Sequence, residues 1–87
     1  MSRAWIQVFG SGREPEVVLF TNGEEPSEED ITAFRDDPNP VKHFFRVDLD
    51  GLGVIETILD VETGQERTNL PWVRNLVSST IADHPAE

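Results

Sequence analysis

Residues 44–60, FFRVDLDGLGVIETILD, decide the fold because they combine two alternating segments with a glycine-rich turn. Residues 43–49 and 53–61 alternate with a period of two, which is the pattern of β-strands. The three-residue loop around Gly51 suits a tight turn, because glycine adopts backbone angles that other residues avoid. The stretch therefore predicts an antiparallel hairpin. The alternation places these residues together on one face: Phe45, Val47, Leu49, Ile55, Thr57, Leu59 and Val61.

The same stretch also raises the alternative of a calcium-binding loop of the EF-hand type. Four positions match that pattern, namely Asp48, Asp50, Gly53 and Ile55. However, Leu52 replaces a side-chain oxygen donor, and Leu59 replaces the bidentate glutamate that completes the shell. An EF-hand also needs helices on both sides, whereas these flanks alternate as strands do. We therefore favour the hairpin and expect neither a metal site nor a cofactor.

Two strands and a helix are predicted before the hairpin. Residues 3–9 (RAWIQVF) alternate as a strand does, and residues 16–21 (EVVLFT) are predicted as a second strand. The link at residues 10–15 is short enough to join them as an antiparallel pair. A short helix follows over residues 27–36, where Ser27 is a good N-terminal cap.

A second helix is predicted at the carboxyl end, with Pro71 in its first turn. Residues 66–69 fit either a short edge strand or the approach to this helix. Together the elements predict a single α+β domain over residues 1–87, with a mostly antiparallel sheet of four to five strands. The predicted order is ββαββα, and the sheet packs on the C-terminal helix. The predicted core contains Ile6, Val8, Phe45, Val47, Ile55, Leu59, Val73, Leu76 and Val77.

The composition narrows the classes of function. Seventeen acidic and seven basic residues give a net charge of −10, which disfavours direct binding to nucleic acid or to anionic membranes. The chain has no cysteine and no apolar run long enough to span a membrane, and residues 1–10 lack the apolar core typical of a signal peptide. We therefore expect a cytoplasmic protein. His43 and His84 lack metal-ligand spacing, and no motif pairs a nucleophile with a base. We therefore do not expect an enzyme.

Acidic residues cluster around the first predicted helix. The cluster consists of Glu24, Glu25, Glu28, Glu29, Asp30, Asp36 and Asp37. Capping explains one or two of the acids near the helix start, but Asp36 and Asp37 lie at the end where the helix dipole disfavours negative charge. The cluster predicts a protein partner with a basic surface. In its sharpest form the chain inhibits a nucleic-acid-handling protein by mimicking nucleic acid, as some phage proteins do. The alternative is acidity for solubility or salt adaptation, as in halophiles, with no electrostatic partner.

A second candidate surface is apolar. Alternation places Trp5, Phe9, Phe44 and Ile58 opposite the predicted core face, together with Val54. An exposed apolar patch of this kind marks an interaction surface, and it makes a homodimeric structural or assembly subunit the alternative function. The competing interpretation is that a terminal segment, a second chain or the first helix covers these residues.

Overall fold

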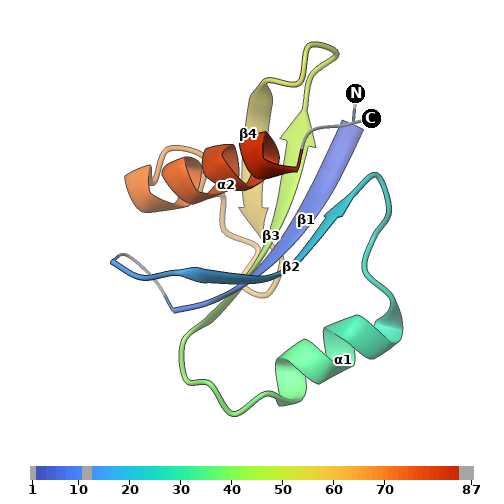
Figure 1. Ribbon diagram of the computed structural model, residues 1–87, viewed down its shortest axis with the longest axis vertical. Coiled ribbons are helices and arrows are strands. Elements are labelled where there is room, and N and C mark those ends of the chain that lie inside the picture. Colours follow the sequence, from blue (N-terminus) through green and yellow to red (C-terminus); the bar gives the residue numbers. More distant parts are fainter. Residues whose placement is uncertain (1, 11–12, 85–87) are drawn as a thin grey trace.

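The computed structural model describes residues 2–10 and 13–84, in which two helices lie against one four-stranded sheet (Figure 1). Neighbouring strands are antiparallel, and their order across the sheet is β2-β1-β3-β4. The elements are β1 (Ser2–Phe9), β2 (Glu16–Asn22), α1 (Glu28–Asp36), β3 (Lys42–Leu49), β4 (Ile55–Asp60) and α2 (Pro71–Asp83). The predicted α+β class and the order ββαββα are confirmed. Residues 11 and 12, within the predicted link between the first two strands, lie outside the described residues.

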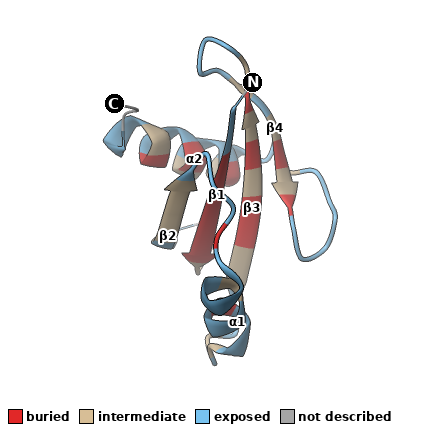
Figure 2. Ribbon diagram, turned by 90° about the vertical axis from the view of Figure 1, so that its right-hand side faces the viewer, coloured by how far each residue is buried: buried red, intermediate tan, exposed pale blue. Residues whose placement is uncertain are grey.

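The main core lies between α2 and one face of the sheet, which we call the α2 face. Figure 2 shows α2 behind the strands and α1 in front of them, near one end of the sheet. The buried members of this core are Ala4, Ile6, Val8, Phe45, Val47, Leu49, Ile58, Val73 and Val77. Most of the predicted core is therefore confirmed. Ile55 and Leu76 are partly buried and pack against it.

The predicted face of the fourth strand is wrong, because the pairing of β3 with β4 contains an irregularity. Leu49 pairs with Ile55, whereas the preceding Asp48 pairs with Thr57. One additional residue of β4 therefore lies between these two pairs. An insertion of one residue moves all following side chains to the other face of the sheet, since side chains alternate with a period of two.

The consequence concerns the two aliphatic residues near the end of β4. Ile58 is completely buried under α2 and takes the core place that was predicted for Leu59. Leu59 pairs with Arg46 and lies on the opposite face, where it is partly exposed. The prediction that Ile58 shares a face with Trp5 is therefore also wrong.

The opposite face, which we call the α1 face, is covered at one end by α1. Phe34 is the buried residue of this helix. Its ring stacks on Phe9 with 5.7 Å between centroids and meets Phe44 edge-on at 6.0 Å. Trp5 and the partly buried Ile31 complete this second cluster. A single aromatic side chain thus anchors most of α1.

The two edges of the sheet differ. Beside β4, Leu59 forms an isolated bridge with Glu66, and the Thr68 hydroxyl oxygen accepts the N–H of Ile58 at 3.0 Å. The N–H of Arg67 also donates to the carbonyl of Ile58 at 2.7 Å. This segment therefore covers the β4 edge without forming a fifth strand in the described part of the chain.

Within residues 2–10 and 13–84, neither helix is long and apolar enough to cross a membrane.

Candidate functional site

The acidic cluster lies around α1, and the start of that helix explains part of it. The Ser27 hydroxyl oxygen accepts the N–H of Asp30 at 3.1 Å, which is the predicted cap. Glu28, Glu29 and Asp30 occupy the first turn, where the helix dipole favours negative charge. Local helix chemistry therefore accounts for these three acids.

Lys42 caps the end of α1, an interaction that the local sequence did not indicate. The Lys42 ammonium group donates to the carbonyl oxygens of Phe34, Arg35 and Asp37 at 2.9, 2.7 and 2.9 Å. A cation at this position satisfies free carbonyl groups and opposes the negative end of the helix dipole. It offsets the unfavourable placement of Asp36 and Asp37 that the sequence alone indicated.

The basic residue in the last turn of α1, Arg35, is also engaged away from the cluster. The guanidinium of Arg35 donates to both carboxylate oxygens of Glu62, each at 2.9 Å. The hydrogen bonds from Arg35, together with its charge, lower the pKa of Glu62 despite the opposing effect of burial. This bidentate pair joins α1 to the segment after β4.

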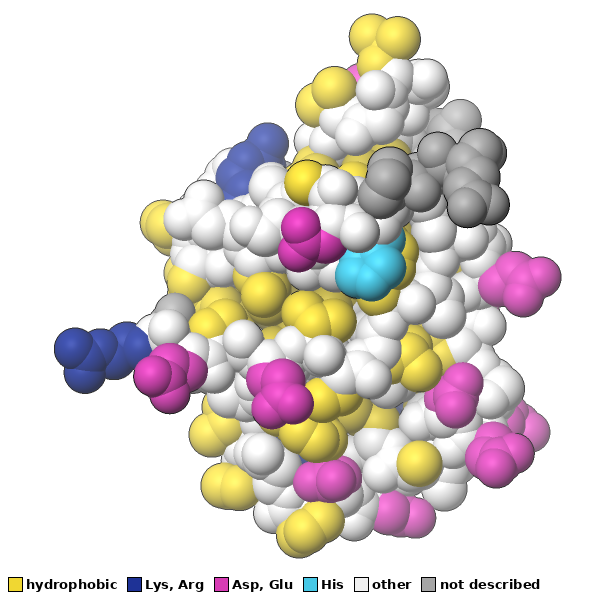
Figure 3. Space-filling view, viewed as in Figure 1, with side chains coloured by type: hydrophobic (Ala, Val, Ile, Leu, Met, Phe, Trp, Pro, Cys, Tyr) yellow, Lys and Arg dark blue, Asp and Glu magenta, His cyan; other side chains and the backbone are white. Residues whose placement is uncertain are grey.

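Most of the cluster is exposed to solvent. We call its seven residues the α1 acidic surface: Glu24, Glu25, Glu28, Glu29, Asp30, Asp36 and Asp37. Six are exposed and Asp37 is partly buried, and none forms an ion pair with another described residue. Figure 3 shows acidic side chains gathered over α1 at the lower right. Lys42 is held by backbone carbonyls at the end of α1, and Arg35 is held by Glu62.

The predicted apolar surface is not an exposed patch in this structure. Trp5 and Phe44 are 8% and 2% exposed, because α1 and its Phe34 cover them together with Phe9. Ile58 lies on the other face of the sheet, under α2. Of the interpretations weighed for these residues, coverage by the first helix describes the arrangement.

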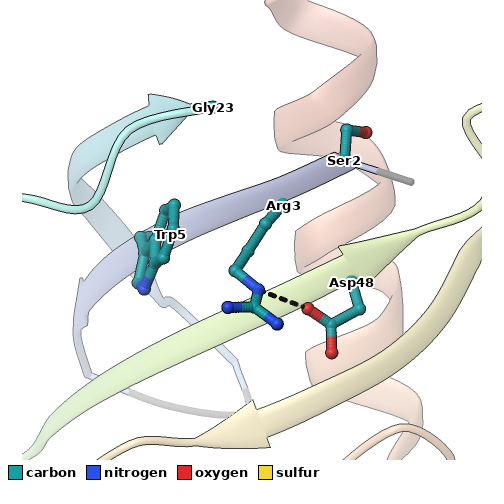
Figure 4. Close-up of a pocket in the computed structure, with 5 residues that line it drawn as sticks. All are labelled: Ser2, Arg3, Trp5, Gly23 and Asp48. Carbon is teal, nitrogen blue, oxygen red and sulfur yellow. Dashed lines mark hydrogen bonds and ion pairs between the residues drawn. The ribbon is translucent and has the colours of Figure 1, made fainter.

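The uncovered part of the α1 face carries a small charged site. Arg3 Nε donates to Asp48 Oδ1 at 2.8 Å, and Arg46 Nη2 donates to Asp48 Oδ2 at 3.4 Å. Figure 4 shows Arg3 and Trp5 projecting side by side from β1 into a pocket of about 480 Å³. A guanidinium group suits a carboxylate or phosphate ligand, but Arg3 in this lining is already paired with Asp48. Among the described residues, the lining of this pocket has no histidine and no pair of carboxylates for acid–base catalysis.

The two aspartates of the predicted hairpin, Asp48 and Asp50, have structural roles. Asp50 Oδ1 accepts the N–H groups of Leu52 and Val54 at 2.8 and 2.9 Å, and these bonds lower the pKa of Asp50. Asp48 pairs with arginines instead. In residues 2–10 and 13–84, no three histidines, cysteines or carboxylates gather as metal ligands would.

The fold and the site together define a small acidic α+β domain with charged surfaces on the α1 side. Comparisons with protein-family models, with curated proteins and with solved structures find no match to this chain.

Proposed function

We propose that this chain is a small protein-binding module that engages a basic surface on a partner through the α1 acidic surface. In the specific form of the proposal, the partner handles nucleic acid and the chain inhibits it by occupying its basic groove. The module binds and does not catalyse a reaction.

The observation that supports this proposal is the state of the cations beside the cluster. Lys42 is held by three carbonyl groups of the α1 end, and Arg35 is held by Glu62. If the cluster served solubility alone, these cations could equally pair with its carboxylates, because an exposed ion pair changes stability by only about 0–1 kcal/mol. Here the negative field of α1 remains available to a partner.

An electrostatic interaction of this kind should depend strongly on salt concentration. A surface with several unpaired carboxylates attracts basic proteins over distances near the Debye length, which is about 8 Å at physiological salt. Such an association is fast at low salt and weakens steeply as salt rises. Apolar docking would depend little on salt.

The test compares two charge reversals of equal size. One variant carries Glu25→Lys and Glu29→Lys on the α1 acidic surface. Its control carries Glu56→Lys and Asp83→Lys, which are exposed acids outside that surface. Each variant changes the net charge by +4, from −10 to −6. Proteins retained from a cell lysate by the immobilised chains are compared at low and high salt, after circular dichroism has confirmed folding.

The proposal expects a defined set of basic proteins that bind the wild type and the control but not the α1 variant, and that elute with salt. Dissociation constants for a purified member should rise at least tenfold in the α1 variant. Equal retention by all three chains would mean that the acidity serves solubility or salt adaptation.

A further inference from the structure

A groove of about 250 Å³ lies between α1 and β2 on the α1 face of the sheet. Its helix wall and its strand wall come from different parts of the sequence, and the floor belongs to β1. The lining residues that matter here are Asp30, Ala33 and Asp37 from the α1 side, Val18 and Leu19 from β2, and Gln7 from β1. The groove thus borders the α1 acidic surface on one side and an edge strand on the other.

The floor of this groove holds a polar group without a partner. Gln7 is 3% exposed, and its Nε2 has no hydrogen-bond partner among the described residues. An unpaired buried amide is unfavourable, and a ligand group that reaches it removes that cost. By turning about its last bond, the amide can present either its donor or its acceptor to the ligand.

The strand wall is an open edge of the sheet. β2 pairs with β1 on one side only, whereas the residues after β4 cover the opposite edge. Free N–H and C=O groups along an edge strand accept an extended segment as a further strand. An irregularity in the β1–β2 pairing leaves Val18 without a partner, so the regular part of this edge is residues 19–22.

The charges around β2 decide what kind of segment fits. Glu14 and Glu16 lie at one end of the strand, and Glu24 and Glu25 follow its other end. If a second copy paired antiparallel about Leu19, Glu14 would face Glu24 of that copy, and like charges directly opposite are unfavourable. A basic segment instead meets Glu14 and Glu16 at one end, where Arg13 opposes them in part, and Glu24 and Glu25 at the other. It also meets acidic residues along the helix wall of the groove.

We propose that an extended segment of a partner protein, bearing arginine or lysine, adds to β2 as a further strand and places a basic side chain in the groove toward Asp30 and Asp37. The inference rests on the proposed function, because it uses part of the α1 acidic surface. It goes further by assigning the form of the partner segment and the strand that receives it.

The probe is a synthetic peptide in which arginine alternates with threonine, and a glutamate–threonine peptide of equal length is the control. The wild-type chain should bind the arginine peptide in a fluorescence titration at low salt and should not bind the control peptide. Hydrogen exchange followed by NMR should slow for the amides of Phe20 and Asn22 when the arginine peptide is bound, because their N–H groups point away from β1 in the observed register. Exchange in β4 should not change.

Two variants place a cation at the docking site without touching the core. Val18→Lys acts on the strand wall, where Val18 is 39% exposed, and Ala33→Arg acts on the exposed helix wall. The matched controls are Val54→Lys in the hairpin loop and Ala82→Arg on α2, both at exposed positions. Each docking variant should raise the dissociation constant of the arginine peptide at least tenfold, and each control should raise it less than threefold.

The outcomes separate this inference from the proposed function. Peptide binding could be weakened by the Glu25→Lys and Glu29→Lys variant but not by Val18→Lys or Ala33→Arg. In that case strand addition is wrong and the acidic binding surface stands. Unchanged exchange in β2, or no binding of the arginine peptide to the wild type, also overturns the inference. If neither set of variants weakens binding of the arginine peptide, both proposals fail.

Discussion

Truncation of Phe34 to alanine should detach α1 from the sheet while the α2 face stays folded. Burial of a phenylalanine side chain contributes about 1.5–3 kcal/mol, and its two aromatic contacts add about 0.5–1.5 kcal/mol each. Their sum agrees with the loss of about 3–5 kcal/mol that is typical of such truncations. The other apolar contact of α1 with the sheet is the partly buried Ile31. This remaining contact is too small to hold a nine-residue helix.

The measurement is hydrogen exchange of backbone amides in the Phe34→Ala variant. Amides of α1 should exchange at rates near those of an unfolded peptide, while amides of β1 and β3 keep their protection. The control is Phe45→Ala, the same truncation in the α2-face core, where Phe45 is 1% exposed. This control should lower the global free energy of unfolding by about 3–5 kcal/mol, enough to unfold a marginal small domain.

Two results would refute this reasoning. If Phe34→Ala unfolds the whole sheet cooperatively, the two clusters form one unit. If α1 keeps its protection, then Lys42 and Arg35 hold the helix without the aromatic anchor. A loss below 1 kcal/mol for Phe45→Ala would mean that the core has been assigned to the wrong face.

Two further predictions concern pH and the hairpin loop. Burial lowers the pKa of His43 below its ordinary value of 6.5, against the opposing effect of Asp60, so the unfolded chain takes up this proton at a higher pH than the folded protein. The free energy of unfolding, measured with urea, should therefore fall between pH 7.5 and pH 5.5, and an equal fall in His43→Leu would contradict this assignment. Asp50→Ala removes the acceptor for two loop amides, so exchange in residues 50–54 should accelerate and the Tm should fall, whereas Asp50→Asn should retain most of the protection. Millimolar calcium should leave the Tm of the wild type unchanged, and a calcium-dependent rise that needs Asp48 and Asp50 would restore the metal-site interpretation.

The sequence predicted the elements well because each was encoded by neighbouring residues. Alternation over residues 3–9 and 43–49 is a local property, and it appears directly as β1 and β3. Ser27 caps α1, and Pro71 opens α2, for equally local reasons. The position of the acidic residues around α1 was likewise fixed once that helix was predicted.

The candidate site was less predictable because its parts are far apart in the sequence. Lys42 reaches the end of α1, and Gln7 lies under a groove formed with α1 and β2. A single glutamine within an apolar alternating strand was the available signal for the latter. The neighbouring sequence does not indicate that Arg35 pairs with Glu62 and not with the acids beside it, because this pairing depends on how α1 packs on the sheet.

By itself the sequence determined the strands, the helices, their order and the concentration of negative charge, because propensity, capping and alternation act over a few residues. Only the tertiary structure decided which side of β4 is buried, because one unpaired residue opposite β3 reverses the alternation that a sequence pattern assumes to be continuous. It also decided that Trp5 and Phe44 lie under α1, since the ring that covers them belongs to Phe34, and contact between segments is set by the packing of the whole chain.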